Sequence, residues 1–389
     1  MKLNRIFLLI AMFLFHFVNA QQNDEAKGSD LCSKRKQLNT HLVEKSFRTV
    51  MATKHSFDVL KYTMNIDLVN CFTNPYPKSF QADVTLSFRA DSTLNTIALN
   101  AVNTSLTIDS IRLNAASFVH SANMLTIQLD RTYDPGEEAN VRIYYHHKDV
   151  SDGAFYASGG FVFTDCEPEG ARYWFPCYDK PSDKALTDIS AMVPSTVLLG
   201  SNGGLKDSLL DGSTLKYHWV SRDPVATYLM VLTARTNYKL DIVNWTNPNT
   251  SEVVPMRFYY NPGENPTAMK NIIVPLTTYF SEKYGDEPFE KNGFATLNNQ
   301  FVWGGMENQT LTSLCSNCWS ESLIVHEYAH QWFGDMLTCN TWADIWLNEG
   351  FATWSEALWY ERTGGYTAYK NDIINNATNY KNSNTGWAI

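Results

Sequence analysis

Two histidines and a glutamate in the stretch LIVHEYAHQWFGDM, residues 323–336, have the spacing of a metal site with its own base. In a helix, residues four apart lie on one face and one turn from each other, so His326 and His330 would project together. Glu327 would lie beside the metal without ligating it. The pattern predicts a zinc site whose carboxylate accepts a proton from water, with two hydrogen-bonded histidines of a core helix as the alternative.

A catalytic zinc site uses three protein ligands and keeps one open position, so a third ligand must come from elsewhere in the chain. Residues 342–362 have the pattern of a second amphipathic helix that ends at Gly364-Gly365. Glu349 opens its main body, 19 positions after His330, where a carboxylate can reach a metal held by the first helix. An acidic residue near a helix start can instead simply favour the helix dipole.

Three motifs and one upstream stretch together resemble a known family. GGMENQT (304–310), HEYAHQWFGD (326–335) and WLNEGFATW (346–354) follow one another as in the zinc aminopeptidases typified by aminopeptidase N and leukotriene hydrolase, which are gluzincin metallopeptidases. The stretch CEPEGARYWFPCYDKPSDKA (166–185) is similar to the signature of that family's β domain. The resemblance covers roughly residues 57–389.

The resemblance implies a zinc-dependent aminopeptidase that hydrolyses the N-terminal peptide bond of peptides. His326, His330 and Glu349 would hold one Zn2+ per chain, and Glu327 would be the general base. Its partners would be peptides with a free N-terminal amine.

The resemblance also implies a set of substrate-binding residues: Gly304, Gly305, Met306, Glu307, Asn308 and Glu167. Glu307 and Glu167 would share the substrate's α-ammonium, and the two glycines would let the strand lie against the peptide backbone. An internal peptide nitrogen would leave such carboxylates unpaired, so the free amine would be selected. A strand-edge charge for Glu307 and a surface acid for Glu167 are the alternatives.

The elements that must position these residues fall into two parts. From residue 57 to 257, short runs alternate apolar and polar side chains between turn signals, which predicts an antiparallel β domain with one buried face. Residues 258–389 predict a mainly helical, thermolysin-like catalytic domain, with a helix over Thr267–Tyr284. The expected fold class is therefore α+β and multidomain.

The N-terminus has the features of an export signal. A basic start, a short apolar run and small residues at 18–20 predict a signal peptide over residues 1–20, followed by an arm or linker over 21–56. Cleavage would lower the net charge from −9 to −11. An acidic surface disfavours nucleic acid and anionic membranes as partners. We expect an exported protein with no stable membrane span after signal removal.

Seven cysteines in an exported chain permit disulfides. Cys315 and Cys318 form a C-x-x-C without a second such pair, which favours a local disulfide or plain packing over a zinc ribbon.

The family resemblance also exposes a missing part. Its members use a tyrosine some sixty residues beyond the glutamate ligand to stabilise the oxyanion, whereas this sequence stops at Ile389, only 40 residues past Glu349. We expect a fragment of a longer gene product, inactive by itself. The alternatives to an aminopeptidase are a thermolysin-like endopeptidase, an epoxide hydrolase of the leukotriene type, and a non-catalytic scaffold that has kept the fold.

Overall fold

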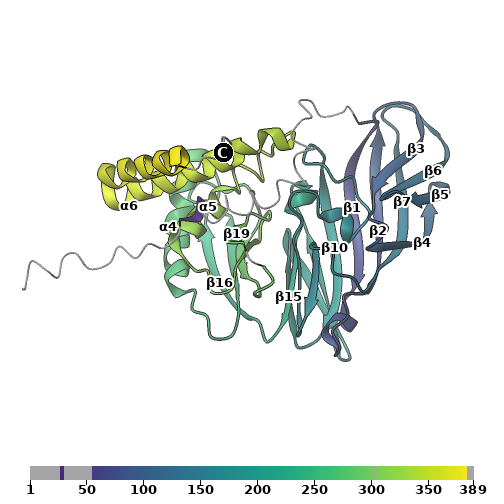
Figure 1. Ribbon diagram of the computed structural model, residues 1–389, viewed down its shortest axis with the longest axis horizontal. Helices are drawn as coiled ribbons and strands as arrows, with labels where there is room; N and C mark the ends of the chain where they lie inside the picture. The colour runs from purple at the N-terminus through teal and green to yellow at the C-terminus, as the bar shows by residue number, and fades with distance from the viewer. Residues whose placement is uncertain (1–26, 30–54, 302, 383–389) are drawn as a thin grey trace, which may run out of the picture.

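The computed structural model describes residues 27–29, 55–301 and 303–382 (Figure 1). The predicted signal peptide lies outside the described residues, as does most of the predicted arm. In the described part, strands fill the N-terminal half, and helices α4, α5 and α6 gather at the opposite end of the molecule (Figure 1). This division into a β-rich and a helical part confirms the coarse fold prediction.

The largest sheet has eight strands. Seven lie in the order β12 (Gly204–Asp211), β13 (Thr214–Val220), β10 (Lys184–Pro194), β1 (Phe57–Asp67), β2 (Phe80–Ala90), β7 (Glu138–His147) and β4 (Leu106–Leu113), and β14 (Val225–Ala226) pairs with β10. Apolar side chains alternate inward, as the period-two pattern predicts: Met64 pairs with Val84, and both are fully buried. The prediction of a purely antiparallel domain is wrong at one place, because β1 and β10 pair in parallel. Alternation reveals a half-buried strand but not the direction of its neighbour.

Two smaller sheets complete the β-rich half. One has the order β11 (Val197–Ser201), β15 (Leu232–Thr236), β9 (Phe161–Thr164) and β8 (Phe155–Ser158); the other has β3 (Leu94–Asn100), β6 (Met124–Tyr133) and β5 (Ala115–Ser121). Four short 3-10 turns connect elements: η1 (Val69–Phe72), η2 (Ala171–Tyr173), η3 (Thr227–Leu229) and η4 (Trp342–Asp344).

A five-stranded mixed sheet carries the helical part. Its order is β16 (Lys239–Thr246), β17 (Val253–Tyr260), β18 (Asn292–Thr296), β20 (Thr312–Leu314) and β19 (Gly305–Met306). Strand β17 pairs in parallel with β18, across the intervening helix α4. The predicted domain boundary at 257/258 falls inside β17 and stays a prediction.

Among the described residues, helices α4 (Thr267–Tyr284) and α5 (Glu321–Ala329) contact this sheet, and α6 (Ile345–Asn382) packs on α5. Helix α4 has the predicted bounds and ends before Gly285, which has a φ of 104°. Helix α6 is broken at Gly365, where φ and ψ leave the helical region, so the predicted stop is a kink after which helix resumes. Apolar side chains of the helices and sheet form one buried core, including Ile273, Tyr328 and Trp359. No helix within the described ranges is long and apolar enough to cross a membrane.

Candidate metal centre and substrate site

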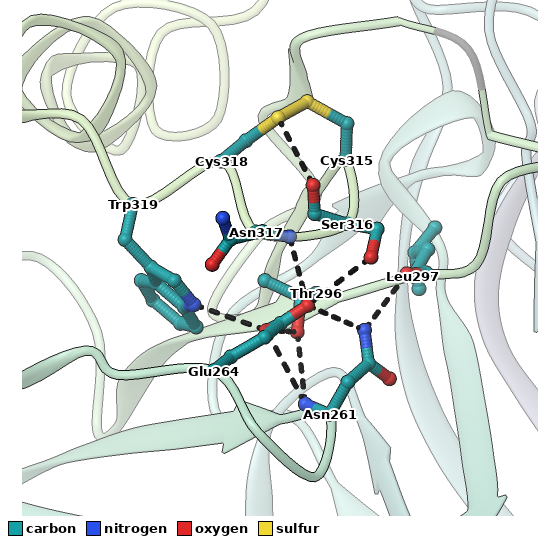
Figure 2. The surroundings of a disulfide bond; sticks show 9 residues. All are labelled: Asn261, Glu264, Thr296, Leu297, Cys315, Ser316, Asn317, Cys318 and Trp319. Carbon is teal, nitrogen blue, oxygen red and sulfur yellow. Dashed lines mark hydrogen bonds between the residues drawn. A yellow bond between two sulfur atoms is a disulfide. The ribbon is translucent and has the colours of Figure 1, made fainter.

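Helix α5 carries His326, His330 is its C-cap, and the C-x-x-C loop leads into the start of the helix. Cys315 and Cys318 form the predicted local disulfide. Figure 2 shows Glu264 beneath this loop, where it accepts hydrogen bonds from the Asn317 amide at 2.8 Å and the Trp319 indole at 3.1 Å. The loop lies between β20 and α5, so these contacts tie the start of the helix to the five-stranded sheet.

His326, His330 and Glu349 converge on one point, although two come from α5 and its C-cap and one comes from α6. The Nε2 atoms of the histidines lie 3.3 Å apart, and the Glu349 oxygens lie 3.4 Å from His326 Nε2 and 3.6 Å from His330 Nε2. All three side chains are buried.

These separations fit a single zinc ion. Donors at about 2.0–2.2 Å from a tetrahedral metal lie about 3.3–3.6 Å from one another, which matches the observed triangle. Two imidazoles and one carboxylate are also a donor set that zinc uses in hydrolases.

The other nitrogen of each imidazole is held by a protein acceptor, which turns Nε2 toward the shared point. His326 Nδ1 lies 2.8 Å from Glu356 Oε1, and His330 Nδ1 lies 3.0 Å from the carbonyl of Phe333. Ser322 also donates to Glu356. The sequence motifs did not single out Glu356. It lies seven residues after Glu349, two helical turns along the same face of α6, and that spacing is the signal that could have found it.

The turn after His330 requires a glycine. Gly334 has a φ of 141°, and an added Cβ would lie 3.1 Å from His330 Nδ1. The adjacent Asp335 is a further buried carboxyl at this turn. Burial raises the pKa of Asp335 well above its ordinary value, and the nearby charge of Glu307 adds to the increase. Lys184 holds the turn by donating to the Asp335 carbonyl at 2.6 Å.

Glu327 faces strand β19. One oxygen of Glu327, one of Glu307 and a nitrogen of His330 lie within 4.8 Å of one another. Gly305 packs directly on the Glu327 side chain, because an added Cβ would lie 2.7 Å from its Cγ and closer still to its carboxylate. The structure thus brings the proposed base, the zinc triad and the Gly-Gly-Met-Glu-Asn segment together.

Glu307 is 3% exposed, and its Oε1 has no hydrogen-bond partner among the residues that the structure describes. Met306 and Asn308 are buried beside it, and Asn308 Oδ1 accepts a hydrogen bond from Ser313 at 2.8 Å. Gly304 is buried one residue before Gly305, and its carbonyl accepts the Cys315 amide at 2.9 Å.

Glu167 comes from the β-rich half and is half-buried. Like Glu307, Glu167 contributes its charge to the electrostatic surroundings of Tyr228. Burial raises the pKa of Tyr228 well above its ordinary value, and the charges of Cys339, Glu307, Asp335 and Glu167 add to it.

Tyr228 was not predicted as a site residue, yet it links the two segments that carry the candidate zinc ligands. Its hydroxyl lies 3.3 Å from the Gly334 carbonyl and accepts from Asn348 Nδ2 at 3.2 Å. Gly334 follows His330, and Asn348 precedes Glu349. Nothing in the local sequence around Tyr228 distinguishes it from a core tyrosine.

The tyrosines of α6 do not enter the site. Tyr360 is half-buried, Tyr366 stacks on Tyr369, and Tyr380 is exposed. We therefore assign none of them to oxyanion stabilisation.

Comparison with known protein families shows to which family the chain belongs. Residues 60–229 match the Peptidase M1 N-terminal domain, and residues 268–386 match the Peptidase family M1 domain. The chain belongs to peptidase family M1.

Its M1 relatives include aminopeptidases of fungi and mammals. The chain is 28% identical over 362 residues to Aminopeptidase 2 of Candida albicans, an alignment that covers 85% of this chain and 37% of that relative. It is 31% identical to glutamyl aminopeptidase of Rattus norvegicus over 50% of this chain and 22% of that relative. The chain therefore spans well under half the length of these relatives.

Solved M1 structures share the fold. The M1 zinc metallopeptidase from Deinococcus radiodurans, in a mutant bound to a Tyr-Ser-Ala substrate, aligns with a TM-score of 0.72 and 26% identity over 80% of this chain and 72% of that chain. M1 zinc metallopeptidases use Zn2+, and the donor triangle described above fits that ion.

Proposed function

We propose that this chain carries the catalytic site of a zinc-dependent aminopeptidase that removes N-terminal residues from peptides. The observation that carries the proposal is the buried oxygen of Glu307 beside the proposed zinc triad, which has no hydrogen-bond partner within the described part of the chain. A buried carboxylate without a hydrogen bond is costly, and a substrate ammonium would supply both charge and donors.

The chain's own residues divide the work between binding and proton transfer. His326, His330 and Glu349 would hold Zn2+, which when bound polarises a peptide carbonyl and acidifies a water molecule. Glu327 would accept the proton of the attacking water and pass it to the departing amine nitrogen.

Glu307 and Glu167 would fix the substrate's ammonium and so place the first peptide bond beside the triad. A peptide without a free amine would offer these carboxylates no ammonium to bind, which costs affinity and gives selectivity for the chain end. The same geometry disfavours an endopeptidase. The complete ligand triangle disfavours a non-catalytic scaffold.

Several further features belong to the same proposal. The helical part would be a thermolysin-like catalytic domain, and activity would belong to a longer product that contains this chain. Residues 1–20 would direct export, so that the enzyme would meet its peptides outside the cytoplasm.

The test is Glu327→Gln in the longest natural form of the protein. We expect aminoacyl-anilide hydrolysis to fall by about 10²–10⁴-fold, the usual contribution of a general base. Zinc content, measured by elemental analysis, should stay unchanged because Glu327 is not a ligand. Full activity in the variant would rule out the proposed base.

A further inference from the structure

Thr310, the last residue of the segment 304–310, has an unusual backbone conformation. Its φ is 68°, although threonine is β-branched, and it is 1% exposed. Such a conformation is unfavourable for a β-branched residue and persists only where the surroundings fix it. It follows Glu307 by three residues, so it terminates the segment that the proposed function assigns to amine binding.

Each polar group of Thr310 is fixed by a different partner. Its amide donates to Gln331 Oε1 at 2.9 Å, and Gln331 directly follows the zinc ligand His330. Its carbonyl accepts from Lys291 Nζ at 2.9 Å, and its hydroxyl accepts from the Gly203 amide at 2.8 Å. Thr310 therefore connects the segment after the zinc helix, through Gln331, with Lys291 and Gly203 in other parts of the molecule. We call these contacts of Thr310 the anchor.

Lys291 is 1% exposed and forms no ion pair with any residue in the described ranges. Its ammonium donates to the carbonyls of Ser201, at 2.8 Å, and Thr310, and it lies 5.0 Å from the ring centroid of Trp219. Burial lowers the pKa of Lys291 well below its ordinary value. An apolar side chain would be easier to bury here than a lysine, so a purely structural role is a poor explanation for it.

The turn at residues 201–203 completes the anchor. Ser201 accepts from Lys291, Asn202 Nδ2 donates to the Gln309 carbonyl at 2.7 Å, and Gly203 donates to Thr310. Gly203 has a φ of 78°, and an added Cβ would collide with the carbonyl of Val220. Three consecutive residues of this turn thus meet the end of the 304–310 segment, directly or through Lys291.

We propose that Lys291 is a positioning residue that sets the place of Glu307 relative to the zinc ligands, and thereby the affinity for a substrate ammonium. It acts through the Thr310 carbonyl, which it holds against the 201–203 turn, and not by touching the substrate. This inference rests on the proposed function, because Glu307 must bind the amine for its place to matter.

The experiment is Lys291→Met in the longest natural form of the protein, with Lys61→Met as the matched control. Lys61 pairs with Asp188 at 2.7 Å across β1 and β10, away from the site. We expect the KM for an aminoacyl anilide to rise about 10–100-fold, as for the loss of a hydrogen bond to a charged group, while kcat changes much less. Zinc content should be unchanged, and a free amino acid should lose most of its inhibitory advantage over its N-acetylated form.

A second variant covers the case in which Lys291→Met does not fold. Thr310→Gly accepts the positive φ without strain but removes the hydroxyl that binds Gly203, so we expect a smaller rise in KM at unchanged zinc content. If the wild type discriminates free from acetylated ligands and both folded variants behave like it, the inference is wrong and the proposed function stands. Equal inhibition of the wild type by both ligands would overturn the proposed function itself. Loss of zinc together with loss of folding in both variants would show a purely structural role and would also overturn the inference.

Discussion

Gly305→Ala tests how closely strand β19 is fitted to the proposed base. The added methyl carbon would lie 2.7 Å from Glu327 Cγ and closer still to its carboxylate, whereas apolar carbons rest about 3.5–4.0 Å apart. Glu327 is fully buried, and β19 is held in register by β20. Either the carboxylate or the strand must therefore shift by roughly 1 Å.

A displacement of about 1 Å in catalytic geometry typically lowers the rate about 10²-fold, and complete loss of a general base lowers it about 10²–10⁴-fold. We therefore expect kcat for Gly305→Ala to fall about 10²–10³-fold. The zinc ligands are not displaced by this methyl group, so metal content should not change.

The assay is aminoacyl-anilide hydrolysis together with zinc analysis, and Gly350→Ala is the matched control. Gly350 directly follows the proposed zinc ligand Glu349, but a Cβ added there meets nothing within 4 Å. In a helix, alanine is also favoured over glycine by about 1 kcal/mol, so this variant should be active and at least as stable. A wild-type kcat in Gly305→Ala would show that β19 does not constrain Glu327, and our account of the cleft would fail.

Two further predictions concern the buried acids around α5. Glu356→Gln should weaken zinc binding about 10–100-fold, because Glu356 orients the proposed ligand His326. Competition with a chelator measures the zinc affinity, and an unchanged affinity would show that Glu356 does not orient His326. Burial raises the pKa of Glu287 from 4.5 to about 7, so the native state binds more protons than the unfolded state between these values and stability falls as pH rises through this window. Glu287→Gln should flatten this pH dependence. Relative to the wild type, the variant's free energy of unfolding in urea should be up to about 3 kcal/mol higher at pH 8 than at pH 4. A pH dependence equal to that of the wild type would contradict this prediction.

The sequence predicts best what local periodicity determines. The helix over Thr267–Tyr284 has the expected bounds, because its apolar residues recur at helical spacing and Gly285 ends it. The alternating strands are also recovered. Parallel pairing of β17 with β18 could not be predicted, because it depends on the path of α4 over the sheet and not on either strand's own pattern. The predicted boundary at 257/258 was placed where the pattern changes, whereas the sheet continues across it.

In the site, too, residues in local motifs could be predicted, whereas residues whose roles depend on distant packing could not. The zinc triad and Glu327 lie in two motifs with strong spacing, and the structure brings them together. Glu356 has a weaker signal, since it lies two turns beyond Glu349. Tyr228 and Lys291 have no local signal, because their roles arise only when distant segments pack against the turn after His330 and against Thr310.

The central claim is most directly tested by comparing hydrolysis of one short peptide with a free N-terminus and of its N-acetylated form by the zinc-loaded, longest natural protein. We predict that the first residue is released from the free peptide and that the acetylated peptide is cleaved at least about 10²-fold more slowly, because it has no ammonium for Glu307 and Glu167 to bind. Equal cleavage of both peptides, or cleavage at an internal bond, would contradict an aminopeptidase.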